Sequence, residues 1–121
     1  MSECIFCNSN KSLGESKYWF YQYDGFPVSP GHMLIIPRRH VSSFFDLLPE
    51  ELDELPDVIK EVKNHIDSFY EPDGYNIGVN IGETAGQSVM HCHIHVIPRY
   101  KGDVKNPRGG VRGVIPNKQN Y

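Results

Sequence analysis

Three histidines alternate with apolar residues in the stretch His91-Cys92-His93-Ile94-His95-Val96. Side chains of an extended strand alternate between its two faces. The three histidines are therefore expected to share one face, with the residues between them packed into the core. A core strand does not need three of the six histidines of a chain, so the chemistry is expected here.

On spacing alone, this histidine cluster fits two kinds of site. Three histidines on one face of a strand could hold a zinc ion with an open coordination position. Alternatively, a neutral imidazole can attack phosphorus or carbonyl carbon while a neighbouring histidine serves as the acid. Gly86-Gln87-Ser88 directly before the cluster supplies donors suited to phosphate oxygens. No nearby carboxylate is obviously placed to orient three metal ligands, which favours the nucleophilic alternative.

A second cluster, Cys4-Ile5-Phe6-Cys7, is compatible with a redox pair or with half of a zinc site. A thioredoxin-like motif should follow a strand and open a helix, but residues 8–12 show no helical pattern. The chain has three cysteines, an odd number, and its N-terminus has no signal-peptide layout. These features argue against a disulfide framework and indicate thiols or metal ligands in a cytoplasmic protein.

The elements that must position these clusters are strands on either side of one long helix. Besides the histidine strand, strands are expected at 17–23, 32–37 and 75–80. A helix is expected from Pro49 to just before Pro72, with carboxylates in its first turn and apolar residues three and four apart. Pro56 lies inside this pattern and predicts a kink or a short break. The order predicts an α+β fold with a mainly antiparallel sheet, in a single domain covering 1–121.

Charge is distributed unevenly along this chain of 121 residues, whose net charge is −3. From Arg99 onward six basic residues stand against one acid, Asp103. Residues 104–121 are rich in glycine and are expected to be largely irregular, with a short strand near 111–115. Such a basic tail suggests an anionic ligand near the C-terminus, although a solvated tail explains the charge equally well. No run is long and apolar enough to span a membrane.

Taken together, these motifs resemble the histidine triad (HIT) family. The segment from His91 to Ile97 matches the family signature, His-φ-His-φ-His-φ-φ with φ apolar, at every position. The segment from Pro27 to Pro37 resembles the family's upstream motif, and Asn80 stands where the family places a polar active-site residue. The resemblance covers roughly residues 4 to 103. It implies a HIT-like fold of about five strands with one long and one short helix.

The resemblance further implies a nucleotidyl hydrolase or transferase acting at the α-phosphate of a nucleotide through a covalent nucleotidyl-histidine intermediate. His93 would be the nucleophile, and His95 would contact the phosphate and protonate the leaving group. Ser88 and Gln87 would hydrogen-bond phosphate oxygens or the bridging atom. The implied nucleotide-binding residues are Asn80 and Asp24 near the ribose, and Ile5 and Phe6 around the base. His32 is interpreted as a buried histidine hydrogen-bonded to its neighbours rather than as a catalytic one.

For the cysteine pair, the resemblance implies a structural zinc site. Its ligands would be Cys4, Cys7, His40 and His91, so His91 would have a different role from the other two triad histidines. Cys92 should point away from this site, into the core. No organic cofactor is implied, and catalysis itself should need no metal.

The substrate is suggested by Pro98-Arg99-Tyr100-Lys101-Gly102-Asp103, which resembles the fragile-histidine-triad branch and bacterial diadenosine polyphosphate hydrolases. A dinucleoside polyphosphate such as diadenosine tetraphosphate is therefore favoured, with adenine as the base. Arg108 and Arg112 could approach its phosphates. Alternatives are a nucleoside phosphoramidate hydrolase and a nucleotide-binding interaction module with vestigial catalysis. A role on nucleic acid is less favoured because no nucleic-acid module accompanies the tail. The family is typically homodimeric.

Overall fold

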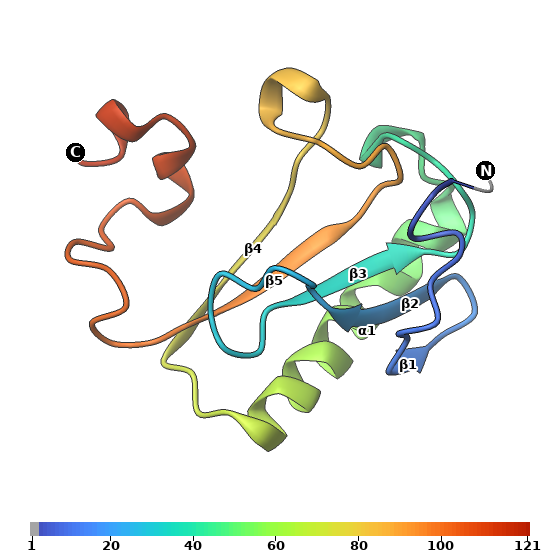
Figure 1. The fold of residues 1–121 in the computed structure, drawn as a ribbon, viewed down its shortest axis with the longest axis horizontal. Coiled ribbons are helices and arrows are strands. Elements are labelled where there is room, and N and C mark those ends of the chain that lie inside the picture. The colour runs from blue at the N-terminus through green and yellow to red at the C-terminus, as the bar shows by residue number, and fades with distance from the viewer. Residues whose placement is uncertain (1–2) are drawn as a thin grey trace.

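The computed structural model describes residues 3–121 (Figure 1). Its centre is a five-stranded sheet with the strand order β1-β2-β3-β5-β4, in which every neighbouring pair is antiparallel. The strands are β1 (Gly14–Glu15), β2 (Trp19–Tyr23), β3 (Met33–Pro37), β4 (Gly74–Val79) and β5 (Ile94–Arg99). The predicted α+β class with a mainly antiparallel sheet is confirmed.

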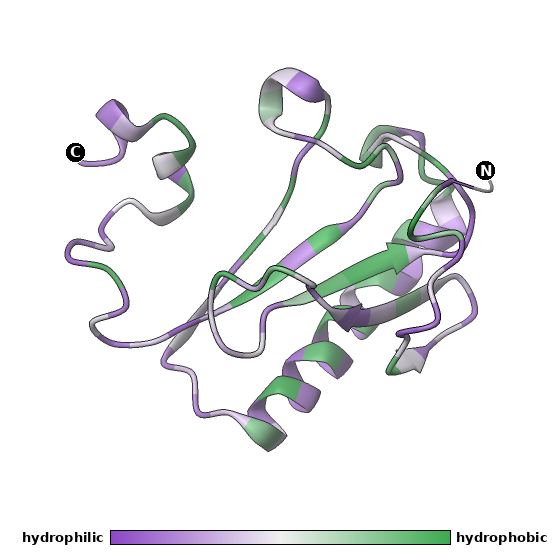
Figure 2. Ribbon diagram, viewed as in Figure 1, coloured by the Kyte–Doolittle hydropathy of each residue, from purple (hydrophilic) through white to green (hydrophobic). Residues whose placement is uncertain are grey.

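One long helix, α1 (Pro49–Phe69), covers one face of the sheet (Figure 1). Its apolar stripe is seen as the green segments of α1 in Figure 2, and Val62 and Ile66 of this stripe are fully buried. The core lies between this stripe and the inner side chains of the strands. On the opposite face, Phe6 of the N-terminal segment packs with Leu34 and Ile36 in a second, smaller core cluster, and the rest of that face leaves room for a pocket.

The sequence predicts a kink or a short break at Pro56; the helix is continuous through this residue, so the break is wrong. Proline removes the hydrogen bond to the carbonyl four residues earlier, here that of Leu52. Leu52 is 38% exposed, on the outer side of the helix, where water can donate a hydrogen bond to its carbonyl. Leu55 and Val58, on either side of the proline, are anchored in the core. Packing therefore outweighs the local preference of one residue.

The histidine strand begins later than the sequence predicts, because regular pairing of β5 starts only at Ile94. The alternation nevertheless holds across the boundary, since Cys92, Ile94 and Val96 all belong to the buried core beneath α1. Burial raises the pKa of the Cys92 thiol to about 11, as expected for an inert core cysteine. The histidines thus lie on the face opposite the helix.

The other helices are short 3₁₀ turns at Phe44–Asp46, Glu83–Ala85, Gly110–Val114 and Pro116–Lys118. The predicted strand near 111–115 is therefore wrong. At Gly109, where φ is 92°, a Cβ would collide with the backbone oxygen of Gln119, so the tail closes tightly on itself. The Gln119 amide also donates to the carbonyl of Arg108. Within residues 3–121, no helix combines the length and apolarity that crossing a membrane requires.

Glu51, in the first turn of α1, carries a buried carboxylate that joins the helix to the end of β3. It is only 2% exposed. It accepts the backbone N–H of Leu48 at 2.7 Å and a bond from the Arg39 guanidinium at 2.8 Å. Burial opposes its charge, but Arg39 and the Leu48 N–H hold the pKa of Glu51 below its ordinary value of 4.5.

Fold stability is therefore expected to decline in acid through Glu51. Because the folded pKa lies below the unfolded value, this contribution is present above that unfolded value and is lost as pH falls through the folded pKa. Glu51→Gln should lower the free energy of unfolding at neutral pH by about 2 kcal/mol and flatten the acid dependence. Urea denaturation across pH 3 to 7 would measure both effects. Glu50→Gln, at an exposed position of the same turn, is the control; an equal change in both variants would contradict the prediction.

Candidate functional site

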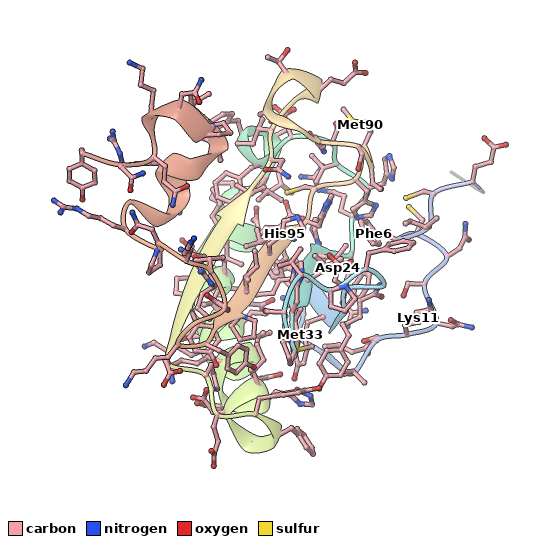
Figure 3. The ribbon with its side chains drawn as sticks, turned by 60° about the vertical axis from the view of Figure 1, so that its left-hand side comes forward. Phe6, Lys11, Asp24, Met33, Met90 and His95 are labelled. Carbon is pink, nitrogen blue, oxygen red and sulfur yellow. The ribbon has the colours of Figure 1, made fainter. Side chains whose placement is uncertain are left out.

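A pocket of about 630 Å³ opens on the sheet face opposite α1. Its lining includes the predicted residues Ile5, Phe6, Asp24, Asn80, Ser88, His93 and His95. They come from the N-terminal segment, the loop after β2, the loop after β4 and the triad segment. Figure 3 shows Phe6 turned from the N-terminal segment toward the region of Asp24 and His95. The fold thus gathers parts of the chain that are distant in sequence.

His93 is held with one ring nitrogen facing the backbone. Its Nδ1 lies 2.8 Å from the carbonyl oxygen of His91. Only a protonated Nδ1 can bond to a carbonyl, so a neutral His93 carries its proton there and keeps a lone pair on Nε2. The Phe6 ring packs edge-on against the imidazole, with the ring centroids 5.0 Å apart. His93 therefore has both the tautomer and the fixed orientation that a nucleophile needs.

His32 is buried and hydrogen-bonded, as the sequence predicts, but one partner is the triad histidine His95. His32 Nδ1 accepts the backbone N–H of Val28 at 3.1 Å, so the proton of a neutral His32 is on Nε2. That Nε2 lies 2.9 Å from His95 Nδ1. His95 Nδ1 is thus the acceptor, and the proton of His95 is on Nε2. The sequence offered one signal for this contact: His32 directly precedes a strand able to pair with the triad strand.

Asp24 lies beside these two histidines. Its Oδ2 is 3.4 Å from His32 Nε2 and 3.9 Å from His95 Nδ1, and its Oδ1 accepts the Phe26 backbone N–H at 2.8 Å. Burial lowers the pKa of His95 to about 4, with His93 and His32 adding to this effect and Asp24 opposing it. His95 is therefore neutral near pH 7. The donor atoms of Asp24, His32 and His95 lie close enough together to bind a metal ion. However, His32 Nε2 carries a proton and cannot act as a ligand, so the three side chains are interpreted as a hydrogen-bonded chain.

Gln87 and Ser88 are placed differently from one another. Gln87 is buried, its Oε1 accepts the Gly82 N–H, and its Nε2 donates to the carbonyls of Ser42 and Val89. The sequence predicts that Gln87 donates to a phosphate oxygen. In the structure both Nε2 protons are donated to backbone carbonyls, so neither is left for a phosphate. Ser88 is exposed and lines the pocket. Gln87 thus holds the loop that presents Ser88.

The four predicted metal ligands, Cys4, Cys7, His40 and His91, lie together beside the pocket, with donor atoms within 4.8 Å of one another. Cys7 Sγ is 3.1 Å from His40 Nδ1, and His91 Nδ1 is 3.4 Å from Cys4 Sγ. His91 Nε2 bonds to the Pro37 carbonyl at 2.8 Å, which leaves Nδ1 unprotonated and aimed at the thiols. Two thiols and two imidazoles are the donor set of a structural zinc site. The residues therefore fit zinc.

The tail arginines do not reach the pocket. The guanidinium carbons of Arg108 and Arg112 lie 5.1 Å and 4.6 Å from the centre of the Tyr121 ring. Neither residue lines the pocket of the triad. Figure 1 shows the tail in red, at the end of the molecule opposite the N-terminus. The predicted approach of these arginines to a bound polyphosphate is therefore not made within one chain.

Comparison with known proteins identifies the family. Residues 7–102 match the HIT domain model. The chain is 43% identical over 77 residues to an asymmetrical bis(5'-nucleosyl)-tetraphosphatase of Schizosaccharomyces pombe; the match covers 64% of the chain and 42% of that protein.

Two crystal structures support the same fold. A HIT family protein from Bacillus anthracis matches with a TM-score of 0.77 and 34% identity, over 84% of this chain and 76% of that one. A zinc-bound histidine triad family protein from Mycobacterium smegmatis matches with a TM-score of 0.77 and 29% identity, over 87% and 81%. The predicted HIT-like fold is thereby confirmed. With its triad, its pocket and its cysteine–histidine cluster in these positions, the chain belongs to the HIT domain family of nucleotide hydrolases and transferases.

Proposed function

We propose that this protein hydrolyses dinucleoside polyphosphates at the α-phosphate, through a nucleotidyl intermediate on His93. The observation that carries the proposal is the 2.8 Å bond between His93 Nδ1 and the His91 carbonyl. It leaves the Nε2 lone pair of His93 to attack an electrophile in the pocket. A second histidine, His95, stands beside it, with the ring centroids 5.2 Å apart.

The reaction proceeds in two displacements. In the first, His93 Nε2 forms a bond to the α-phosphorus and the bond from phosphorus to the bridging oxygen breaks. His95 Nε2–H donates a hydrogen bond to the bridging oxygen, which departs as part of the polyphosphate anion, and Ser88 donates to a phosphate oxygen. In the second, water attacks the phosphorus, the bond from phosphorus to His93 breaks, and a proton of the water is released to solvent. A dinucleoside tetraphosphate yields a nucleoside monophosphate and a nucleoside triphosphate.

Two features bear on the substrate. The S. pombe relative is named as a bis(5'-nucleosyl)-tetraphosphatase, and its matched segment includes 64% of the present chain. The pocket also has apolar side chains for a base, since Ile5 is 61% exposed and Leu34 forms part of the lining. The resemblance favours adenine as that base. A zinc ion in the cysteine–histidine cluster would secure the N-terminal segment that carries Ile5 and Phe6.

A nucleoside phosphoramidate hydrolase is the second candidate, because the same two displacements cleave a phosphorus–nitrogen bond. A panel of dinucleoside polyphosphates, nucleoside phosphoramidates and mononucleotides separates the two. We expect the highest kcat/KM for a tetraphosphate, with equal amounts of monophosphate and triphosphate as products. Mass spectrometry after acid-free quenching should find the nucleotidyl group on His93. Absence of turnover on every substrate, with nucleotides still bound, would instead indicate an interaction module.

The edge strand β4 suggests how two copies associate. It ends the sheet, and its Ile77 is 45% exposed. Joining two such edges would extend the sheet into a homodimer, as is typical of the family. Light scattering coupled to size exclusion should then give twice the chain mass of 13.8 kDa.

His32 is proposed to orient His95 so that its Nε2–H donates to the leaving group. His32→Leu removes the donor to His95 Nδ1, so the proton of His95 can move to Nδ1 and face away from the substrate. We expect kcat to fall roughly 10²-fold for a poor leaving group, and much less for an activated one that needs no hydrogen bond to depart. His32→Asn, which keeps a side-chain donor, should recover part of the loss. A loss independent of the leaving group would mean that His32 is only structural.

A further inference from the structure

The pocket contains a polar group that the reaction does not use, the side-chain amide of Gln22 on β2. Gln22 is 7% exposed and lines the pocket. Strand register puts it opposite Leu34 of β3, which in turn is opposite His95 of β5. These three residues form a row across the open face, with Gln22 about 10 Å from His95, or two strand spacings. A nucleotide with its phosphate at the histidines and its ribose near Asp24 would extend its base along this row, over Leu34.

The orientation of this amide is set by a neighbour on the N-terminal segment. The Ser9 hydroxyl donates to Gln22 Oε1 and itself accepts the Lys11 backbone N–H at 3.2 Å. Among residues 3–121, no group bonds to Gln22 Nε2, and no side-chain nitrogen in that range is both buried and without a partner. The Nε2 amino group is therefore open to the pocket. The pocket wall thus presents two N–H donors at the end of the row that is farthest from the phosphate.

We propose that Gln22 reads position 6 of a purine base and selects a 6-carbonyl over the 6-amino group of adenine. The edge of a purine around position 6 is remote from its sugar, so it meets the far end of the row. A 6-oxopurine shows two neighbouring acceptors there, O6 and N7, which match an amino group. In adenine the 6-amino group is itself a donor, so one N–H would face another and lose its partner. The inference rests on the proposed function and revises the adenine preference implied by the resemblance.

Binding of two product nucleotides to the full chain tests this selectivity. Inosine monophosphate and adenosine monophosphate share phosphate, sugar and ring size; inosine has a carbonyl at position 6 and a proton on N1, where adenosine has an amino group and an unprotonated N1. Isothermal titration should show the inosine nucleotide binding roughly tenfold more tightly. Gln22→Leu should bring the ratio of the two affinities close to one. Gln22→Glu, which offers only acceptors, should reverse the ratio, and Ser9→Ala should reduce it by releasing the amide.

A matched control is Asn117→Leu, the loss of an exposed tail amide, which should preserve the wild-type ratio. Thermal melting would establish that each variant is folded. If Gln22→Leu does not fold, the reversed ratio expected for Gln22→Glu tests the role of Gln22 instead. Equal affinities in the wild type, or a preference that survives Gln22→Leu, would overturn the role of Gln22 and leave the proposed function intact. Failure of the wild type to bind either nucleotide would refute the proposed function and this inference together.

Discussion

Replacing His93 with alanine is expected to reduce kcat by at least about 10⁴-fold, because it removes the atom that forms the bond to phosphorus. Nucleotide binding should change far less. The phosphate and base would still meet Ser88, Ile5 and the rest of the pocket lining. A steady-state assay on a dinucleoside tetraphosphate, with calorimetric binding of the monophosphate product, measures both quantities. The trapped adduct should be absent from the variant.

The matched control is His65→Ala on α1. His65 bonds to the Tyr23 hydroxyl at 3.2 Å and lies outside the pocket, so its loss should leave kcat unchanged. Turnover of His93→Ala within tenfold of the wild type would rule out a covalent intermediate on this residue.

Loss of zinc is expected to have the largest effect on stability. The cluster joins the N-terminal segment to His40 after β3 and to His91 before β5, so one ion would tie three parts of the chain together. Protein purified without added metal should contain about one equivalent of zinc. Cys4→Ser should lower the free energy of unfolding by roughly 3 kcal/mol, or the melting temperature by about 10 °C. Elemental analysis and calorimetry would measure these changes.

Cys92→Ala is the control for a cysteine outside the cluster. Cys92 is 1% exposed in the core beneath α1, so its loss should cost stability through packing while zinc content stays at one equivalent. Brief chelation should spare turnover on the time scale of an assay, since no cluster donor is a group that reacts in the pocket. Less than half an equivalent of zinc, together with unchanged melting of Cys4→Ser, would contradict a structural zinc site.

Local patterns in the sequence were enough to predict much of this protein. The period of two around His93 correctly placed Cys92 in the core, and the spacing of apolar residues correctly predicted the helix from Pro49. The cysteine pair and the family resemblance together named four ligands that the structure brings within reach of one metal. These features could be predicted because side-chain direction follows from backbone geometry over a few residues.

Other features depend on which distant segments meet. The bond from His32 to His95 joins residues 63 apart, and the row from Gln22 to His95 exists only because three strands pair in one register. Contacts between segments likewise lead the Gln87 amide to donate to a loop carbonyl and close the tail around Gln119. The residue pattern alone was enough to predict a candidate histidine nucleophile and a group of possible metal ligands. The bond from His32 that fixes the proton of His95, and the place of Gln22 in the pocket, could be seen only in the folded chain, because hydrogen-bond partners and strand register are set by long-range packing rather than by local residue pattern.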